Sequence, residues 1–159
     1  MPVIVLTTEI YAPIEICFDL ARSIDLHKIS TENSKEEAIA GVTSGLIGLG
    51  EEVTWEATHL CIRQRLSSVI TAFEYPYFFR DEMTNGAFNM FRHDHRFEEV
   101  KGKTIMLDTF EFESPLFVLG RIINKLFLTR YLANLITKRN LVIKTYAEST
   151  KWKQILKQK

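Results

Sequence analysis

The sequence predicts an α+β protein in which an antiparallel sheet packs against one long C-terminal helix. Apolar side chains recur at steps of three and four through residues 115–149, which is the spacing of one helical face. Residues 50–113 change to a period of two, which is typical of strands with one covered and one solvated face. Only that sheet offers enough apolar surface to cover the helix, so we expect the two segments to pack together.

The C-terminal helix carries two apolar stripes that are rotated by more than a quarter turn relative to each other. An unbroken helix would have to bury two different faces, so we expect a kink or a short break between Phe127 and Tyr131. The stripes consist of Leu116, Leu119, Ile123, Leu126 and Phe127, and then of Leu128, Leu132, Leu135, Val142 and Tyr146.

A strand and two small helices are expected before the sheet. The β-branched segment from Val3 to Ile10 predicts a first strand, and Ala12-Pro13 begins a helix because proline is tolerated in the first turn. A second short helix or turn is expected over residues 23–30, a polar loop over 31–35 and a strand over 36–41. Four glycines at positions 41, 45, 48 and 50 predict a flexible, turn-rich segment.

The remaining strands are expected over residues 51–59, 62–73, 77–83, 88–98 and 103–113, with a bulge in the second and a break at Tyr75-Pro76. A two-residue turn at Lys101-Gly102 sets the register of the last hairpin. The residues that it places opposite each other are Val100 and Lys103, Phe97 and Met106, His95 and Asp108, His93 and Phe110, and Phe91 and Phe112.

The preceding hairpin adds further polar side chains to the same face of the sheet. A three-residue loop, Asn85-Gly86-Ala87, places Phe79 opposite His93 and Asp81 opposite Phe91. This register gathers four polar side chains within one pair or diagonal of each other on a face that is otherwise rich in phenylalanine. They are Asp81, His93, His95 and Asp108.

Length and composition indicate one soluble domain over residues 1–159, with a basic tail at 150–159. A content of 46% hydrophobic and 25% charged residues is ordinary for a globular protein, and eleven phenylalanines favour a roomy, aromatic-lined interior. Cys17 and Cys61 form no CxxC motif, so we expect two buried thiols in a reducing cytoplasm and neither a disulfide framework nor a zinc site. The chain start lacks the basic region of a signal peptide, so no signal peptide is expected. Charged residues interrupt the most apolar stretch, so no membrane-spanning helix is expected.

The net charge is zero but it is unevenly distributed. Residues 120–159 contain ten Lys and Arg against Glu148 alone, so this part carries +9 and the remainder −9. We interpret this as a basic helix that packs beside an acidic sheet. The alternative is contact with anionic lipid or acidic partners, because Trp152, Ile155 and Leu156 lie among the lysines of the tail. The charge is accompanied by no aromatic–basic strand motif or recognition helix, which argues against nucleic acid.

Several residues stand at particular places along these elements: Ala12-Pro13 after the first strand, then Pro76, Phe79, Asp81, Gly86, Phe91, His93, His95, Phe97, Asp108, Phe112 and Pro115. With them, residues 3–147 resemble bacterial members of the START-like superfamily, often labelled SRPBCC or polyketide cyclase/dehydrase-like. The resemblance implies the helix-grip fold, a curved sheet of six to seven strands wrapped around the C-terminal helix with an apolar cavity between them. It implies no shared catalytic set, because the superfamily includes lipid carriers, hormone receptors and cyclases.

We therefore expect a cytoplasmic protein, monomeric or homodimeric, that binds an apolar or amphipathic small molecule such as a lipid or a polyketide-like compound without a cofactor. Arg139 is included in the site because it replaces an apolar residue in the helix stripe, where it would clamp a ligand anion or else extend to solvent. The candidate ligand-binding residues are Phe79, Asp81, Met83, Phe91, His93, His95, Phe97, Asp108, Phe110, Phe112, Leu135 and Arg139.

Two histidines beside carboxylates in an apolar pocket also permit an enzyme. His93 and His95 with Asp108 would move protons in a cyclisation or dehydration, although we rank structural or ligand-orienting roles first. No metal site is predicted, because no Cys or third histidine joins the His-x-His pair. His27 and His59 are expected at the surface or at helix ends. Residues 41–50 carry no phosphate-binding signature and are expected to form a mobile lid over the cavity mouth.

Overall fold

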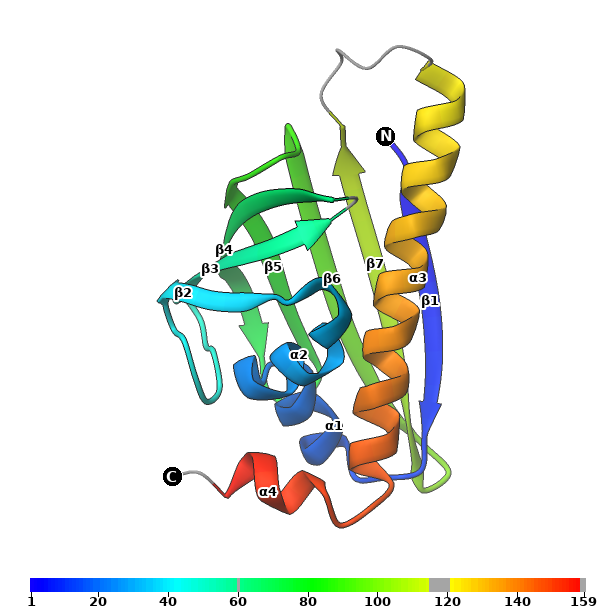
Figure 1. The fold of residues 1–159 in the computed structure, drawn as a ribbon. Helices are drawn as coiled ribbons and strands as arrows, with labels where there is room; N and C mark the ends of the chain where they lie inside the picture. The colour runs from blue at the N-terminus through cyan, green and yellow to red at the C-terminus, as the bar shows by residue number, and fades with distance from the viewer. Residues whose placement is uncertain (60, 115–120, 158–159) are drawn as a thin grey trace.

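The computed structural model describes residues 1–59, 61–114 and 121–157, and a seven-stranded antiparallel sheet curves around a long helix (Figure 1). The strand order is β1-β7-β6-β5-β4-β3-β2, so β2 to β7 pair in sequence and β1 pairs with β7. The predicted helix-grip architecture is confirmed. The elements are β1 (Val3–Ile10), α1 (Ile14–Ala21), α2 (Ile24–Ser30), η1 (Glu32–Ser34), β2 (Glu37–Gly41), β3 (Glu52–His59), β4 (Ile62–Glu74), β5 (Phe78–Asn85), β6 (Met90–Val100), β7 (Lys103–Glu113), α3 (Arg121–Ala147) and α4 (Trp152–Leu156).

The two small helices lie inside the curve of the sheet, beside the lower half of α3 (Figure 1). Pro13 caps α1, and the Ser23 side chain accepts a hydrogen bond from the Leu26 backbone N–H at the start of α2. Most of the apolar side chains of α1 are buried, and the Phe18 ring makes edge contacts with Phe79 and Phe97 at 5.3 Å between centroids. The main core therefore lies where α1 meets the sheet.

The register of the last hairpin is confirmed residue by residue, from Val100 opposite Lys103 to Phe91 opposite Phe112. Lys101 and Gly102 both have positive φ, 51° and 78°, as a tight two-residue hairpin turn requires.

The preceding hairpin differs from the prediction by two residues. Phe79 lies opposite His95, and Asp81 lies opposite His93. The cause is the connection, because β5 continues to Asn85 and β6 begins only at Met90, which is longer than the expected three-residue loop. A shift of two leaves each side chain on the same face of its strand, so the polar residues still share one side of the sheet.

The expected break in the C-terminal helix is wrong, because α3 is one continuous helix of 27 residues. It does not bury two faces: the side chains of Leu126 and Phe127 stay exposed, at 67% and 55%. The described face toward the sheet consists of Ile136, Asn140, Ile143 and Ala147, all buried. The expected stripe residues Leu116 and Leu119 lie outside the described residues, as does the Ile123 side chain.

The expectation of two buried thiols holds for Cys17 only, because Cys61 is exposed. Burial raises the pKa of the Cys17 thiol to about 11, which makes it an unreactive core residue. The segment after α3 turns back along the domain, and Trp152, Ile155 and Leu156 of α4 pack against the main core. None of the described helices is long and apolar enough to cross a membrane.

Candidate functional site

A cavity of about 280 Å³ lies between the inner face of the sheet, α2 and α3. Its volume is near the lower end of the range for small-molecule sites. Eight of the predicted ligand-binding residues line it: Phe79, Asp81, Phe91, His93, His95, Phe110, Leu135 and Arg139. The curved sheet provides about half of the wall, and α2, the segment before β3 and one face of α3 provide much of the rest.

The other four predicted residues lie outside the described lining, where they support the cavity wall. Phe97 packs on Phe18 in the main core, and Phe112 is fully buried in a second apolar cluster together with Phe110. Met83 packs against that second cluster. Asp108, the fourth, lies beneath the histidines that face the cavity.

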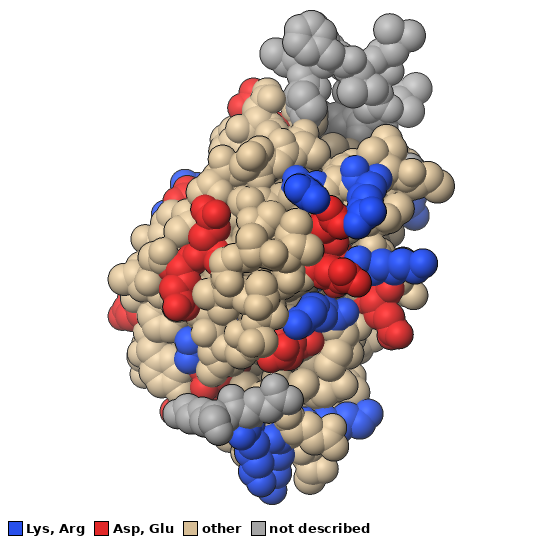
Figure 2. All heavy atoms as spheres, turned by 60° about the vertical axis from the view of Figure 1, so that its left-hand side comes forward, with Lys and Arg blue, Asp and Glu red and all other residues tan. Residues whose placement is uncertain are grey.

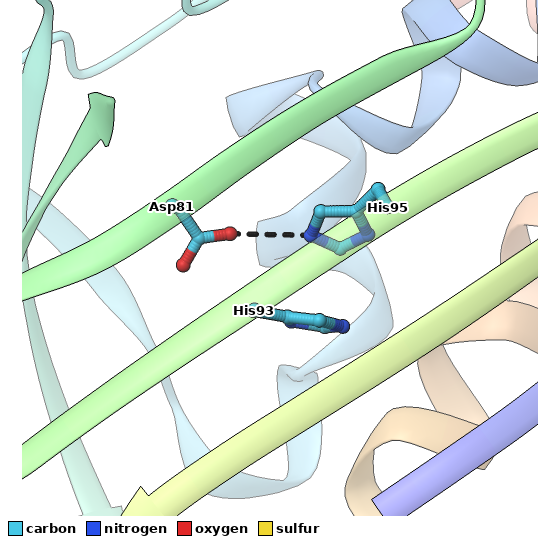
Figure 3. Close-up of side chains that lie close together, drawn as sticks. All are labelled: Asp81, His93 and His95. Carbon is cyan, nitrogen blue, oxygen red and sulfur yellow. Dashed lines mark hydrogen bonds and ion pairs between the residues drawn. The ribbon is translucent and has the colours of Figure 1, made fainter. Parts of the chain in front are cut away.

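Five polar residues form what we call the inner polar cluster: Asp81, His93, His95, Asp108 and Arg139. Figure 3 shows Asp81 projecting from β5 toward the two imidazoles, which project from the neighbouring strand β6. Asp81 Oδ2 lies 3.1 Å from His95 Nε2, and the ring centroids of His93 and His95 are 3.8 Å apart. The histidines are two residues apart in one strand, so both rings necessarily point to the same side of the sheet.

Asp108 connects three elements beneath these rings. His93 Nε2 donates a hydrogen bond to Asp108 Oδ1 at 2.9 Å, and Asn140 Nδ2 on α3 donates to Oδ2 at 2.7 Å. His95 Nδ1 also lies 2.9 Å from Oδ1, without the alignment of a hydrogen bond. Burial alone would raise the pKa of Asp108, but the hydrogen bond from His93 and the adjacent His95 ring outweigh it and hold that pKa well below its usual range. Asp108 is therefore a buried anion that fixes β6 against β7 and α3.

The pKa values of His93 and Asp81 are both lowered, which favours a neutral His93 and an ionised Asp81. Burial lowers the pKa of His93, as does neighbouring His95, against the opposing effect of Asp108. For Asp81, burial is outweighed by the hydrogen bond to His95, so its pKa is lowered. An ionised carboxylate and a neutral imidazole thus face the same cavity.

Arg139 extends into the cavity rather than to solvent. Its Nη2 donates a hydrogen bond to the backbone oxygen of Ala21 at 2.6 Å, which fixes the guanidinium at the end of α1. Its Nη1 lies 3.8 Å from Asp108 Oδ1 and, among the described residues, has no hydrogen-bond partner. A buried donor of this kind is costly unless something accepts from it.

The inner polar cluster also contains a set of residues with the geometry for a metal ion. The candidate ligand atoms of Asp81, His93 and His95 all lie within 4.8 Å of one another. Two of the ring nitrogens, however, are already engaged by carboxylates: His95 Nε2 pairs with Asp81 and His93 Nε2 pairs with Asp108. We therefore interpret the cluster as a hydrogen-bonding site for a ligand.

Much of the lining was not predicted, including four polar residues that are discussed below. His27 and His59 were expected at the surface or at helix ends, yet both line the cavity. One signal existed: His59 continues the covered-face alternation of Val53, Trp55 and Ala57 along β3. His27 on α2 carried no comparable signal, because its position depends on how α2 sits in the curve of the sheet. Asn140, which holds Asp108, was also missed.

The glycine-rich segment at residues 41–50 forms part of the wall. Gly45 N–H donates to the Asp25 side chain at 2.8 Å, and Ile47 hydrogen-bonds to Arg22 through its backbone N–H and through its oxygen. Ile47 is 5% exposed and lines the cavity. Opening of this segment as a lid would require these contacts to break.

Comparisons with known proteins find the fold but no close relative. No protein-family model and no curated protein matches the sequence. Among solved structures, a protein of Thermus thermophilus has a TM-score of 0.71 at 17% identity, covering 92% of this chain and 99% of its own. A START superfamily protein from Mycobacterium smegmatis has a TM-score of 0.67 at 12% identity, covering 90% of this chain and 97% of its own.

A third solved structure, from a plant, has the same fold. A major latex-like protein from Panax ginseng has a TM-score of 0.67 at 12% identity, covering 93% of this chain and 98% of its own. The backbones superpose over nearly the full length although the sequences are only 12–17% identical. The similarity therefore concerns the fold and does not extend to shared site residues. The chain therefore has the helix-grip fold of the START-like superfamily.

Proposed function

We propose that this protein binds an amphipathic small molecule, with the apolar body of the ligand in the cavity and an acceptor group at Arg139. The observation that carries the proposal is that Arg139 lines an apolar cavity while its buried Nη1 has no hydrogen-bond partner among the described residues. A ligand carboxylate or carbonyl oxygen would accept from this nitrogen and so remove the cost of leaving it unpaired.

The apolar part of the lining supports the proposal. Side chains from the sheet and from α3 face one another across the cavity, so an alkyl or ring system would be covered on both sides. Those described by the structure include Ile47, Val53, Trp55, Leu66, Ile70, Phe79, Phe91, Phe110, Leu132, Leu135 and Ile136.

Isothermal titration with decanoic acid tests the proposal, because this probe combines one carboxylate with an apolar chain. Arg139→Met should weaken binding by about tenfold or more, since a hydrogen bond to a charged group contributes roughly 1.5–3 kcal/mol. Leu135→Phe fills the cavity and should weaken binding by about tenfold, because overpacking costs roughly 1–3 kcal/mol. Leu141→Phe is the matched control on the same helix, where the side chain is 60% exposed. Absence of binding, or equal effects of the two phenylalanine variants, would contradict the proposal.

An enzyme remains the second candidate, and the position of His93 favours it. Asp108 accepts from His93 Nε2, so proton transfer to or from a ligand would have to use Nδ1 of a buried, neutral imidazole. Cyclisation or dehydration of a bound polyketide-like compound would need such a base. A His93→Gln variant that still binds such a compound but no longer converts it would support catalysis.

Contact with anionic membranes through the basic C-terminal region has weaker support. Trp152, Ile155 and Leu156, the apolar side chains that would enter a membrane, pack against the main core. Figure 2 shows Lys and Arg side chains interspersed with Asp and Glu over the face in view. On α3, Lys144 contacts Glu148 at 2.6 Å and also bonds to the Glu9 backbone oxygen. These contacts fit a basic helix packed beside an acidic sheet.

A further inference from the structure

A second group of polar side chains lines the cavity, and we call it the rim cluster. It consists of His27 on α2, Glu36 just before β2, His59 at the end of β3 and Tyr131 on α3. These side chains are partly buried: His27 is 26% exposed, His59 23% and Glu36 11%. The rim cluster thus adds polar groups from other elements to the lining of the same cavity.

Hydrogen bonds within the rim cluster define which atoms donate. Glu36 Oε2 lies 2.8 Å from His27 Nε2, and Glu36 Oε1 lies 3.4 Å from His59 Nε2. Burial alone would raise the pKa of Glu36, but hydrogen bonding to His27 and His59 outweighs it and holds that pKa far below its usual range. Glu36 is therefore a carboxylate that accepts from His27 Nε2 and from the Ser34 hydroxyl, with His59 Nε2 close to it.

Tyr131 completes this chain of hydrogen bonds. The Tyr131 hydroxyl hydrogen-bonds to His59 Nδ1 at 3.0 Å, and the His59 tautomer that carries its proton on Nε2, beside Glu36, makes Tyr131 the donor. In that tautomer the hydroxyl proton is used in the bond to His59, and the Tyr131 oxygen offers its lone pairs to a ligand donor. With neutral imidazoles the rim cluster carries one negative charge, which favours a ligand hydroxyl and disfavours a second ligand anion.

One helix face carries both polar anchors and the apolar residues between them. Tyr131 and Arg139 are eight residues apart on α3, which corresponds to about 12 Å along the helix axis. Leu132, Leu135 and Ile136 lie between them and line the cavity. The helix thus presents the sequence polar, apolar, polar to whatever occupies the cavity.

We propose that the ligand is an amphiphile with two polar groups, an acceptor that binds Arg139 and a hydroxyl that donates to Tyr131, separated by an apolar body that lies along α3 between them. The inference rests on the proposed function and narrows it to a ligand class. A hydroxylated fatty acid has this chemistry, whereas a simple fatty acid leaves the rim cluster without a partner.

Three probes separate the possibilities in titrations of wild-type protein: decanoic acid, ω-hydroxydecanoic acid and decanedioic acid. ω-Hydroxydecanoic acid should bind about three- to tenfold more tightly than decanoic acid, which is the range for one added neutral hydrogen bond. Decanedioic acid should bind more weakly than ω-hydroxydecanoic acid, because its second carboxylate meets the negative charge of Glu36. Tyr131→Phe should remove the preference for the hydroxyl and leave decanoic acid affinity within about twofold. Tyr146→Phe, on the same helix and outside the described lining, should retain the preference.

The outcomes distinguish the two proposals. Equal affinity of wild-type protein for decanoic and ω-hydroxydecanoic acid would overturn the two-anchor inference and leave the proposed binding function intact. If no probe binds, both proposals fail. If Tyr131→Phe lowers the melting temperature but keeps the preference for the hydroxylated probe, the rim cluster is a structural clamp between α2, β3 and α3, and the inference is wrong.

Discussion

Replacing Asp108 by asparagine should destabilise the protein by about 3–5 kcal/mol, the usual result of removing one partner from a buried ionic network. Asp108 is 1% exposed, and its two carboxylate oxygens accept from His93 Nε2 and Asn140 Nδ2. Asparagine has the same shape, but its amide offers one acceptor oxygen and an NH₂ group that would face another donor. The substitution therefore removes the negative charge and leaves at least one buried donor unpaired.

Urea unfolding followed by circular dichroism gives the free-energy difference, and a thermal scan should show a decrease of roughly 6–20 °C for a chain of this length. Asp94→Asn is the matched control: Asp94 lies on the same strand as the two histidines and is also buried, but it pairs with Arg80, whose side chain is 28% exposed. Its loss should cost about 1 kcal/mol or less. A cost for Asp108→Asn that is no greater than that of the control would refute the assignment of Asp108 as the buried anion that holds β6, β7 and α3 together.

Two further predictions concern stability. The pKa of His93 is lowered in the folded state relative to its ordinary value of 6.5. As the pH falls below about 6.5, the unfolded chain therefore binds a proton more readily than the folded protein, and the urea midpoint should decrease. A second decrease should follow in the acid range as the two carboxylates of the inner polar cluster, whose pKa values are also lowered, become protonated; a midpoint that rises toward pH 5 would contradict the first assignment. Gly41→Ala should cost about 2–4 kcal/mol in the same assay, because φ is +73° and the new Cβ would overlap the Glu52 carbonyl oxygen. Gly50→Ala, with φ +78° and open space around the new Cβ, should cost only about 1–2 kcal/mol, and equal costs would show that the overlap is relieved by a small shift.

The inner polar cluster was predictable because it depends on local rules. The turn at Lys101-Gly102 sets the pairing of β6 with β7, and the two-residue period of a strand then brings His93, His95 and Asp108 to one face. The adjacent hairpin was displaced by two residues because the loop length could not be read from Asn85-Gly86-Ala87. That displacement is even, so Asp81 still joined the cluster.

Other features depended on exposure and packing. The continuous α3 was missed because the sequence does not tell which apolar residues stay outside, as Leu126 and Phe127 do. The rim cluster was missed because its four residues come from α2, the segment before β2, the end of β3 and α3. Their meeting requires the sheet to curve until the end of β3 reaches the helix, as the His59–Tyr131 contact shows.

The sequence by itself determined the order of the elements, and the covered face and the partners across the last hairpin, since periodicity and turn chemistry act between neighbours in the chain. Tertiary structure alone decided the curvature of the sheet, the burial of Arg139 and Asn140, and the gathering of His27, Glu36, His59 and Tyr131 around the cavity. These depend on the summed packing of residues far apart in sequence, where small differences in twist and helix position change which side chains meet.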